Sequence, residues 1–244
     1  MRRKKLLLLG GSSEAIELQR RLRQYPQLEV IFSLAGSVSK PRVEASRVGG
    51  FGGVEGLVGY IRREAIDLLI DATHPFAANI SFNAYTAANT VGIPHLQLVR
   101  LPWEKQEGDN WIEVKSHQQA ADILPELGNR IFLTIGRQEL SKYAHLRQLW
   151  FLMRMIESPS PPIPPGEIIL ARGPFSLQEE IELLKRYQIQ VIVSKNSGGD
   201  ATYAKIVAAR QLSLPVVMIK RPTFPPANRV FTVDAAIDWL LNFL

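Results

Sequence analysis

The sequence predicts an α/β protein built from two Rossmann-like lobes with mostly parallel sheets and a cleft between them. Short apolar runs alternate with helical patterns almost throughout, and polar, glycine-containing turns follow several of the runs. Such alternation is typical of parallel sheets covered by helices on both faces. It breaks once, near residues 100–115, so we expect domains over residues 1–115 and 116–244.

The first half opens with the run Leu6–Leu9, which we interpret as a buried strand with the basic residues 2–5 at its solvent end. The run is too short for a signal peptide or a membrane span. Further strands are expected at 29–34, 67–71 and 95–99, and helices at 13–25, 53–64 and 76–91.

Residues 100–115 contain Pro102 and two tryptophans and mark the expected crossing between domains. Beyond it, strands are expected at 131–135, 149–156, 168–171, 191–193 and 216–219, and helices at 176–187, 202–212 and 234–243. The proline-rich stretch 159–165 is typical of a stiff surface connection.

Composition narrows the function. The absence of cysteine excludes disulfides, a thiolate nucleophile and cysteine-ligated metal, and the scattered histidines predict no metal site. Net charge is +6, but four basic residues lie at positions 2–5, which leaves an excess of about two. That excess suits a small anionic ligand, so we expect no nucleic-acid or membrane partner and a cytoplasmic location.

The first candidate loop follows the first expected strand and opens a helix. Glycines let a phosphate approach the backbone, and a helix N-terminus favours an anion. The full G-x-G-x-x-G pattern is absent, and a serine-capped helix start is the alternative interpretation. The predicted cofactor-binding residues here are Gly10, Gly11, Ser12 and Ser13.

The end of the second expected strand indicates which dinucleotide would bind. An NAD site would place an acid there for the ribose 2′-hydroxyl, yet no acid occurs before Glu44. Ser37, Lys40 and Arg42 would suit a 2′-phosphate instead, which favours NADPH, unless they form an ordinary basic surface loop. Arg47 extends this loop and is a predicted substrate-binding residue.

A third loop places Asp71, Thr73 and His74 after a strand. We predict that Thr73 contacts the cofactor and that Asp71 and His74 take part in catalysis, since imidazole titrates near neutral pH and Asp71 could orient it. A histidine that only caps the following helix is the alternative.

Loops in the second half add cations and hydroxyls. Gly136 and Arg137 are predicted to bind the cofactor and Arg172 the substrate, because arginine binds phosphates and carboxylates bidentately. Surface ion pairs are the alternative. The stretch 194–205 supplies two predicted catalytic residues, Lys195 and Tyr203, and the predicted substrate-binding residues Asn196, Ser197, Gly198 and Thr202, unless it is an ordinary turn.

Taken together, the loops resemble the precorrin-6A reductase family of cobalamin biosynthesis. The resemblance covers nearly the whole chain in order, through residues 10–15, 49–53, 71–77, 134–140, 172–175, 194–199, 208–210 and 215–219. It implies an NADPH-dependent reductase of a ring-contracted tetrapyrrole, with two Rossmann-like domains and the active site between them. The substrate would be precorrin-6A or cobalt-precorrin-6A, and no residue separates the two.

The resemblance also implies binding partners, but it does not decide which residue donates the proton. An anionic tetrapyrrole is the expected ligand, and transient contact with neighbouring pathway enzymes is a further expectation. For the proton that accompanies the hydride, His74 stands slightly ahead of Asp71, Glu139, Lys195 and Tyr203, because an unperturbed lysine is a poor acid. A non-enzymatic NADP(H)-binding regulatory protein is the competing function, and a small-molecule reductase of another class is the third.

Overall fold

The computed structural model describes residues 2–36 and 47–244. The chain divides into two compact units, Met1–Leu101 with Pro222–Leu244, and Pro102–Arg221. Ser37, Lys40 and Arg42, the residues predicted to bind the 2′-phosphate, lie outside the described residues.

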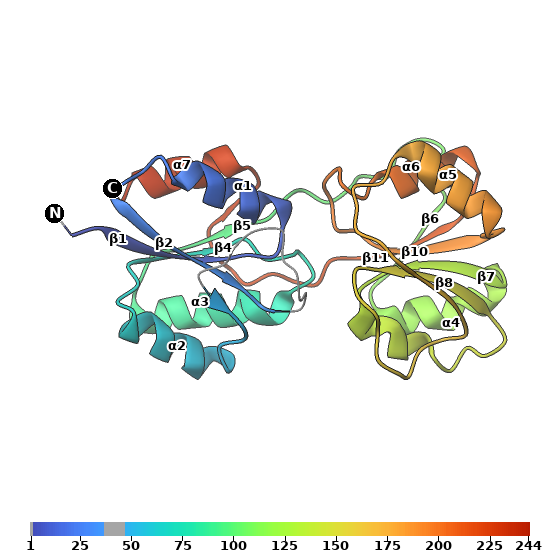
Figure 1. Ribbon diagram of the computed structural model, residues 1–244, viewed down its shortest axis with the longest axis horizontal. Helices are drawn as coiled ribbons and strands as arrows, with labels where there is room; N and C mark the ends of the chain where they lie inside the picture. The colour runs from blue at the N-terminus through green and yellow to red at the C-terminus, as the bar shows by residue number, and fades with distance from the viewer. Residues whose placement is uncertain (1, 37–46) are drawn as a thin grey trace. The chain divides into compact units, whose positions relative to one another are not determined.

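The first unit holds a six-stranded sheet in the order β12-β5-β4-β1-β2-β3, and every pairing in its described part is parallel. Its strands are β1 (Lys4–Leu9), β2 (Leu28–Leu34), β3 (Arg47–Val48), β4 (Leu68–Asp71), β5 (His95–Leu98) and β12 (Arg229–Val230). Helices α1 (Ser13–Leu22) and α7 (Val233–Leu241) cover one face, and α2 (Gly53–Arg63) and α3 (Ala78–Val91) cover the other (Figure 1).

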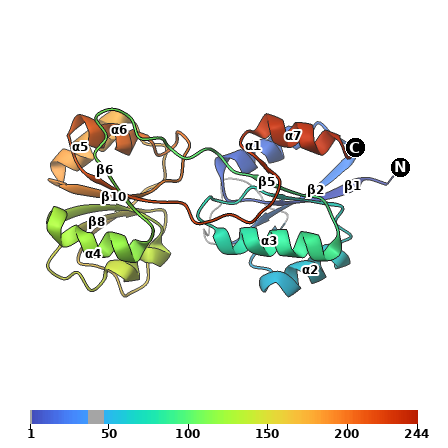
Figure 2. The same cartoon turned by 180° about the vertical axis from the view of Figure 1, so that it is seen from behind.

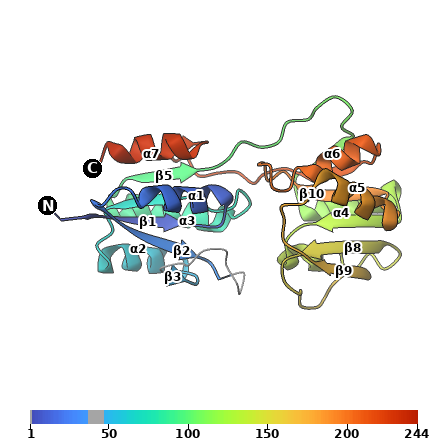
Figure 3. The ribbon, with the colours of Figure 1, turned by 45° about the horizontal axis from the view of Figure 1, so that its top comes forward.

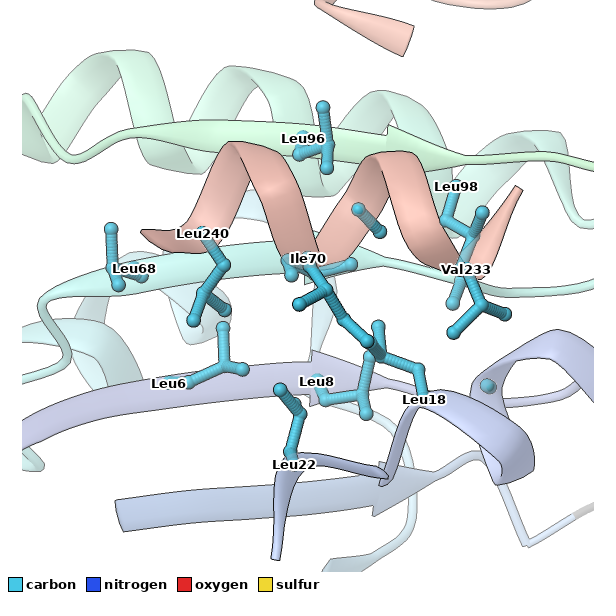
Figure 4. Close-up of a cluster of buried hydrophobic side chains, with 14 of the residues drawn as sticks. Leu6, Leu8, Leu18, Leu22, Leu68, Ile70, Leu96, Leu98, Val233 and Leu240 are labelled. Atoms are coloured by element: carbon cyan, nitrogen blue, oxygen red, sulfur yellow. The ribbon is translucent and has the colours of Figure 1, made fainter. Parts of the chain in front are cut away.

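The central strand β1 is apolar on both sides because both faces of the sheet are covered. Leu6 and Leu8 pack under α1 and α7, whereas Leu7 and Leu9 pack against the α2 and α3 side, as the two-residue period of a strand requires. Figure 4 shows the first of these clusters, in which Leu240 of α7 lies over the sheet.

The second unit repeats the architecture with a six-stranded parallel sheet in the order β6-β11-β10-β7-β8-β9. Its strands are β6 (Trp111–Val114), β7 (Arg130–Thr134), β8 (Trp150–Met155), β9 (Gly166–Leu170), β10 (Val191–Lys195) and β11 (Val216–Ile219). Helices α5 (Leu177–Arg186) and α6 (Ala204–Gln211) cover one face, and α4 (His117–Leu127) covers the other (Figure 2). A 3₁₀ helix, η1 (Arg137–Tyr143), follows β7.

The order of both sheets is that of a Rossmann fold, with the sixth strand taken from elsewhere in the chain. β6 precedes all other strands of the second sheet, and β12 returns to complete the first. The edge strands on the other side of each sheet are β3 and β9; Figure 3 shows β3 beside β2 and β9 beside β8.

The structure therefore differs from the expected division at residue 115. The crossing begins at Pro102, and residues 222–244 belong with the first unit instead of the second. The physical reason is the apolar face of α7, where Val233, Ile237 and Leu240 are buried against the first sheet. Fully burying a side chain of this kind contributes roughly 1.5–3 kcal/mol, which exceeds any local preference of so short a segment.

Candidate functional site

Each sheet has one topological switch point, which is a pair of adjacent strands from which the chain continues toward opposite edges of the sheet. In the first sheet it lies between β1 and β4, and in the second between β7 and β10. Ligands of open α/β sheets bind outside the carboxyl ends of the strands at such points. The loops singled out in the sequence follow these four strands: 10–13 and 72–74 in the first unit, 135–139 and 195–203 in the second.

At the first switch point the two loops touch. A Cβ on Gly11 would lie 3.4 Å from the backbone nitrogen of His74, and one on Gly10 would overlap the ring of Phe32 at 2.5 Å. Gly11 is exposed, so its backbone is open to a ligand. This close approach is the feature that a glycine loop provides to a phosphate group.

The hydroxyl of Ser12 makes its hydrogen bonds within this part of the protein. Its hydroxyl donates to the carbonyl of Ala72 at 2.8 Å and accepts from the backbone N–H of Ala15 at 3.1 Å, which caps α1. Ser13 is exposed, and its hydroxyl donates to Glu14, whose carboxylate also pairs with Arg100 at 3.0 Å. The serine-capped helix start and a phosphate-approachable backbone therefore coexist.

Asp71 is fully buried and acts as an acceptor within the first unit. One oxygen accepts from the backbone N–H of Thr73 at 3.0 Å and from its hydroxyl at 2.6 Å. The other accepts from Gln97 at 3.3 Å, and Gln97 in turn accepts from Arg229 of β12 at 2.8 Å. The carboxylate expected to orient His74 thus shapes its own loop and links it to the returning strand.

His74 is half-buried and its Nδ1 accepts from the backbone N–H of Phe76 at 3.2 Å. This contact closes the turn that precedes α3; it is not a helix cap, because α3 begins at Ala78 and its N-cap residue, Ala77, has no side-chain cap. Arg47, expected to face a substrate, donates to the carbonyls of Gly49 and Gly50 and to Ser33, and its guanidinium lies 3.7 Å from the centre of the Phe51 ring. Its visible role is to close the loop around β3.

At the second switch point Gly136 and Lys195 are neighbours, since a Cβ on Gly136 would lie 3.9 Å from Lys195 Nζ. Burial lowers the pKa of Lys195, and the nearby carboxylate of Glu139 opposes that effect. Arg137 forms an ion pair with Glu157 at 3.0 Å and donates to the carbonyl of Ser158 at 3.4 Å. The structure thus brings Gly136 and Lys195 together and gives Arg137 protein partners.

The loop after β10 is held by a residue that the sequence interpretation passed over. Trp103 and Asn196 exchange two hydrogen bonds, from the Trp103 N–H at 2.8 Å and to its carbonyl at 3.0 Å, and the Trp103 indole donates to Gly199 at 2.8 Å. Arg221 donates to the carbonyls of Asn196 and Ser197 at 2.9 and 3.0 Å. The side chain of Asn196, predicted to bind substrate, is therefore used to shape the loop.

Further along this loop, Tyr203 and Thr202 also have protein partners. The Tyr203 hydroxyl accepts from Arg210 at 3.0 Å, and Arg210 is in turn paired with Asp109 at 2.9 Å. The carbonyl of Thr202 accepts from buried Lys205 at 2.8 Å. Gly198 is buried with φ of 68°, Gly199 follows with φ of 74°, and Arg172 is half-buried. The only sequence signal for the contacts of Trp103 with this loop was a tryptophan in a stretch without periodicity.

Within the described residues, no helix is both long and apolar enough to cross a membrane, and no group of three His, Cys, Asp or Glu side chains is placed to hold a metal ion.

Two Rossmann-ordered sheets, each with a glycine loop at its switch point, define a double Rossmann-like α/β protein of the dinucleotide-binding class. The family model described as Precorrin-6x reductase CbiJ/CobK matches residues 5–241, and the chain belongs to this family. The resemblance seen in the loops is thereby confirmed.

Individual relatives agree over nearly full length. The chain is 46% identical to a precorrin-6A reductase from Rhodococcus erythropolis, covering 97% of both chains, and 42% identical to one from a Sinorhizobium species, covering 100% of this chain and 95% of the relative. A cobalt-precorrin-6A reductase from Priestia megaterium is 27% identical over 97% of this chain and 98% of its own. A solved structure, CobK precorrin-6A reductase, superposes with a TM-score of 0.91 at 40% identity, covering 98% of this chain and 96% of that one.

Proposed function

We propose that the protein is an NADPH-dependent precorrin-6A reductase of cobalamin biosynthesis, which adds a hydride and a proton across one double bond of a ring-contracted tetrapyrrole. The observation that carries this function is the full-length membership of the reductase family, joined to two Rossmann sheets with intact switch-point loops. A cytoplasmic location and transient contacts with neighbouring pathway enzymes stay predictions.

The cobalt-free substrate is the better supported of the two. Relatives named precorrin-6A reductase are 40–46% identical to this chain, whereas those named cobalt-precorrin-6A reductase are 26–28% identical.

NADPH fits the first switch point. Gly10 has no room for a side chain beside Phe32, and Gly11, whose φ of 151° suits glycine, presents its exposed backbone at the N-terminus of α1, where a pyrophosphate is favoured. Gly10, Gly11, Ser13 and Thr73 would surround it, and Ser37, Lys40 and Arg42 would select the 2′-phosphate. When bound, the nicotinamide supplies the hydride, while the protein residues bind, orient and protonate.

We propose Lys195, which ends β10 beside Gly136, as the proton donor. An ordinary lysine is a poor acid at neutral pH, but burial lowers the pKa of Lys195 and makes its ammonium a stronger acid. His74 is the less suitable candidate, because its Nδ1 accepts the backbone N–H of Phe76, which disfavours the imidazolium that would donate the proton. Arg172 and the loop residues Ser197, Gly198 and Thr202 are proposed to hold the substrate rim.

The activity is tested by mixing the protein with precorrin-6A, with and without cobalt, in the presence of NADPH or NADH. Reduction of the cobalt-free substrate with NADPH supports the function in full. Faster reduction of the cobalt form would contradict the substrate assignment, and equal rates with NADH would contradict the cofactor assignment. Absence of any absorbance change, with NADPH still bound, would favour the regulatory NADP(H)-binding protein.

The proton donor is tested by single-turnover reduction at saturating NADPH. Lys195→Met should lose on the order of 10²–10⁴-fold, the usual contribution of general acid catalysis, whereas His74→Gln should stay within a few-fold of the parent. The reverse pattern would restore His74 as the donor. Equal and small losses would indicate that water or the substrate delivers the proton.

A further inference from the structure

Three ionisable side chains from two elements meet near Lys195 at the second switch point. His117 is the first residue of α4, while Glu139 and Tyr143 lie on η1. His117 Nδ1 is 3.0 Å from the Tyr143 hydroxyl, and His117 Nε2 is 3.9 Å from Glu139 Oε2. The two rings meet edge to face with centroids 6.0 Å apart, which fixes the plane of the imidazole.

The contacts define which atoms carry protons. Burial lowers the pKa of His117 to about 4, so the imidazole is neutral at physiological pH. Burial also raises the pKa of Tyr143, so its hydroxyl stays protonated and can donate to His117 Nδ1. A neutral imidazole that accepts at Nδ1 carries its hydrogen on Nε2, which then points toward the Glu139 carboxylate.

The remaining neighbour is the ammonium of Lys195. Glu139 follows β7 and Lys195 ends β10, two strands that pair directly in the sheet; a Cβ on Gly136 would lie 3.9 Å from Lys195 Nζ, and the backbone N–H of Glu139 donates to the carbonyl of Gly136 at 3.1 Å. The carboxylate acts on Lys195 electrostatically and favours the charged amine that burial disfavours. Two cations near this cluster, Lys195 itself and Lys142 on η1, both disfavour a positive charge on His117.

We propose that Tyr143, His117 and Glu139 form an orienting chain, in which the tyrosine fixes the histidine tautomer, the histidine attracts the carboxylate electrostatically across 3.9 Å, and the carboxylate in turn faces the amine of Lys195. His117 and Tyr143 are thus positioning residues of the reduction that act through Glu139. This inference rests on the proposed role of Lys195 as the group that must be protonated for activity.

Glu139→Gln is the primary test, with kcat/KM measured from acid to alkaline pH. Without the carboxylate the pKa of Lys195 falls, so activity should be lost at a lower pH than in the parent. The expected pattern is a loss on the order of tenfold at the alkaline end and a few-fold or less at the acid end, because a shifted pKa changes the rate only where the ammonium fraction changes. Glu139→Asp keeps the charge and should restore most of the alkaline activity.

The control is Glu113→Gln, which makes the same chemical change on β6 of the same unit. Glu113 pairs at 2.8 Å with Lys220 on a half-exposed surface. Its profile should match that of the parent at every pH. A loss for Glu113→Gln equal to that for Glu139→Gln would show that any carboxylate of this unit has the effect, and would overturn the proposal.

Two further variants test the chain beyond Glu139. Tyr143→Phe removes only the hydroxyl, and His117→Phe replaces the imidazole with a larger apolar ring, so each should shift the alkaline limit in the same direction as Glu139→Gln by a smaller amount. Profiles that are uniformly lowered at all pH values, or are unchanged, would show that these residues only support the fold. If Glu139→Gln does not fold, these variants and Glu139→Asp decide the question.

Failure of the proposed function is recognised separately through Lys195→Met. If that variant keeps parental rates, Lys195 is not the required group and the function of the site itself must be revised. If Lys195→Met is inactive while the Glu139, His117 and Tyr143 variants keep the parental pH profile, only the orienting chain is wrong.

Discussion

Trp103 and Asn196 bind each other through two reciprocal hydrogen bonds, although they are ninety-three positions apart in the chain. The backbone N–H and carbonyl of Trp103 both bond to the side-chain amide of Asn196, and the indole N–H donates to the carbonyl of Gly199. The segment that enters the second unit is thereby attached to the loop that follows β10. We infer that this loop is fixed before any ligand arrives, which lowers the entropy cost of binding.

Asn196→Ala should therefore weaken both the fold and the site. It leaves the N–H and carbonyl of Trp103 without their partner, and an unsatisfied buried polar group costs about 1–3 kcal/mol. We expect a lower urea midpoint and a KM for the tetrapyrrole that rises more than the KM for NADPH. Ser160→Ala, on the proline-rich connection, is the control; equal rises in both KM values would contradict a local role for the loop.

The strands at the centre of each sheet could be predicted from sequence because they are continuous apolar runs. Leu6–Leu9 and Val191–Val193 are buried on both sides, which leaves a clear signal. The edge strands β3 and β12 have two residues each and carry no periodicity, so their pairing depends on the sheet they join. The sequence places residues 111–114 in the crossing between domains, but they form β6. Trp111 and Val114 are buried while the two residues between them are not, so the strand has no alternating pattern.

The strand pattern also predicts where the polar loops lie, but it does not predict the contacts that these loops make. Polar loops after strands identified both switch points, including Gly11 and Lys195. Sequence spacing could not show that Asn196 binds Trp103 or that Arg47 binds its own loop, because those contacts depend on the three-dimensional path of the backbone. The contact between His117 and Tyr143 could not be predicted for the same reason, since α4 and η1 meet only after the sheet forms.

Arg154 and Glu180 form a buried ion pair at 2.6 Å beneath α5. The second oxygen of Glu180 has no hydrogen-bond partner among the described residues, so the pair depends on one strong contact. Arg154→Met should cost about 3–5 kcal/mol because it leaves a buried carboxylate with weaker compensation. The double variant with Glu180→Met should cost less than the more damaging single variant; additive losses in urea unfolding would contradict this.

Lys205 is a buried amine whose pKa is lowered to about 7, first of all by burial. An unfolded lysine has a pKa of about 10.4, so between these values the unfolded chain binds more protons than the native protein. Stability should consequently rise with pH from about 7 to about 10, by up to roughly 1.4 kcal/mol per unit from this group. Lys205→Met should flatten that rise.

The measurement for Lys205 is the urea midpoint of parent and variant at several pH values across this window. The variant should gain most, relative to the parent, near pH 7, where the parent is forced to bury or neutralise the amine. Lys185→Met changes an exposed lysine of the same unit and should leave the pH dependence as it is. Parallel stability curves for parent and Lys205→Met would show that the amine is already deprotonated, or still charged, across the window.

The last prediction concerns α7, which lies at the end of the chain but packs on the first sheet. Leu240 is fully buried with Leu6 and Leu8, so Leu240→Ala should cost about 2–5 kcal/mol. The loss should fall on the unit of residues 1–101 with 222–244: amide exchange should accelerate in β1 and β4 and stay unchanged in β10. Leu184→Ala, at an equally buried position of α5, should give the opposite pattern. Faster exchange in β10 on Leu240→Ala, with β1 protected, would assign the C-terminal segment to the second unit after all.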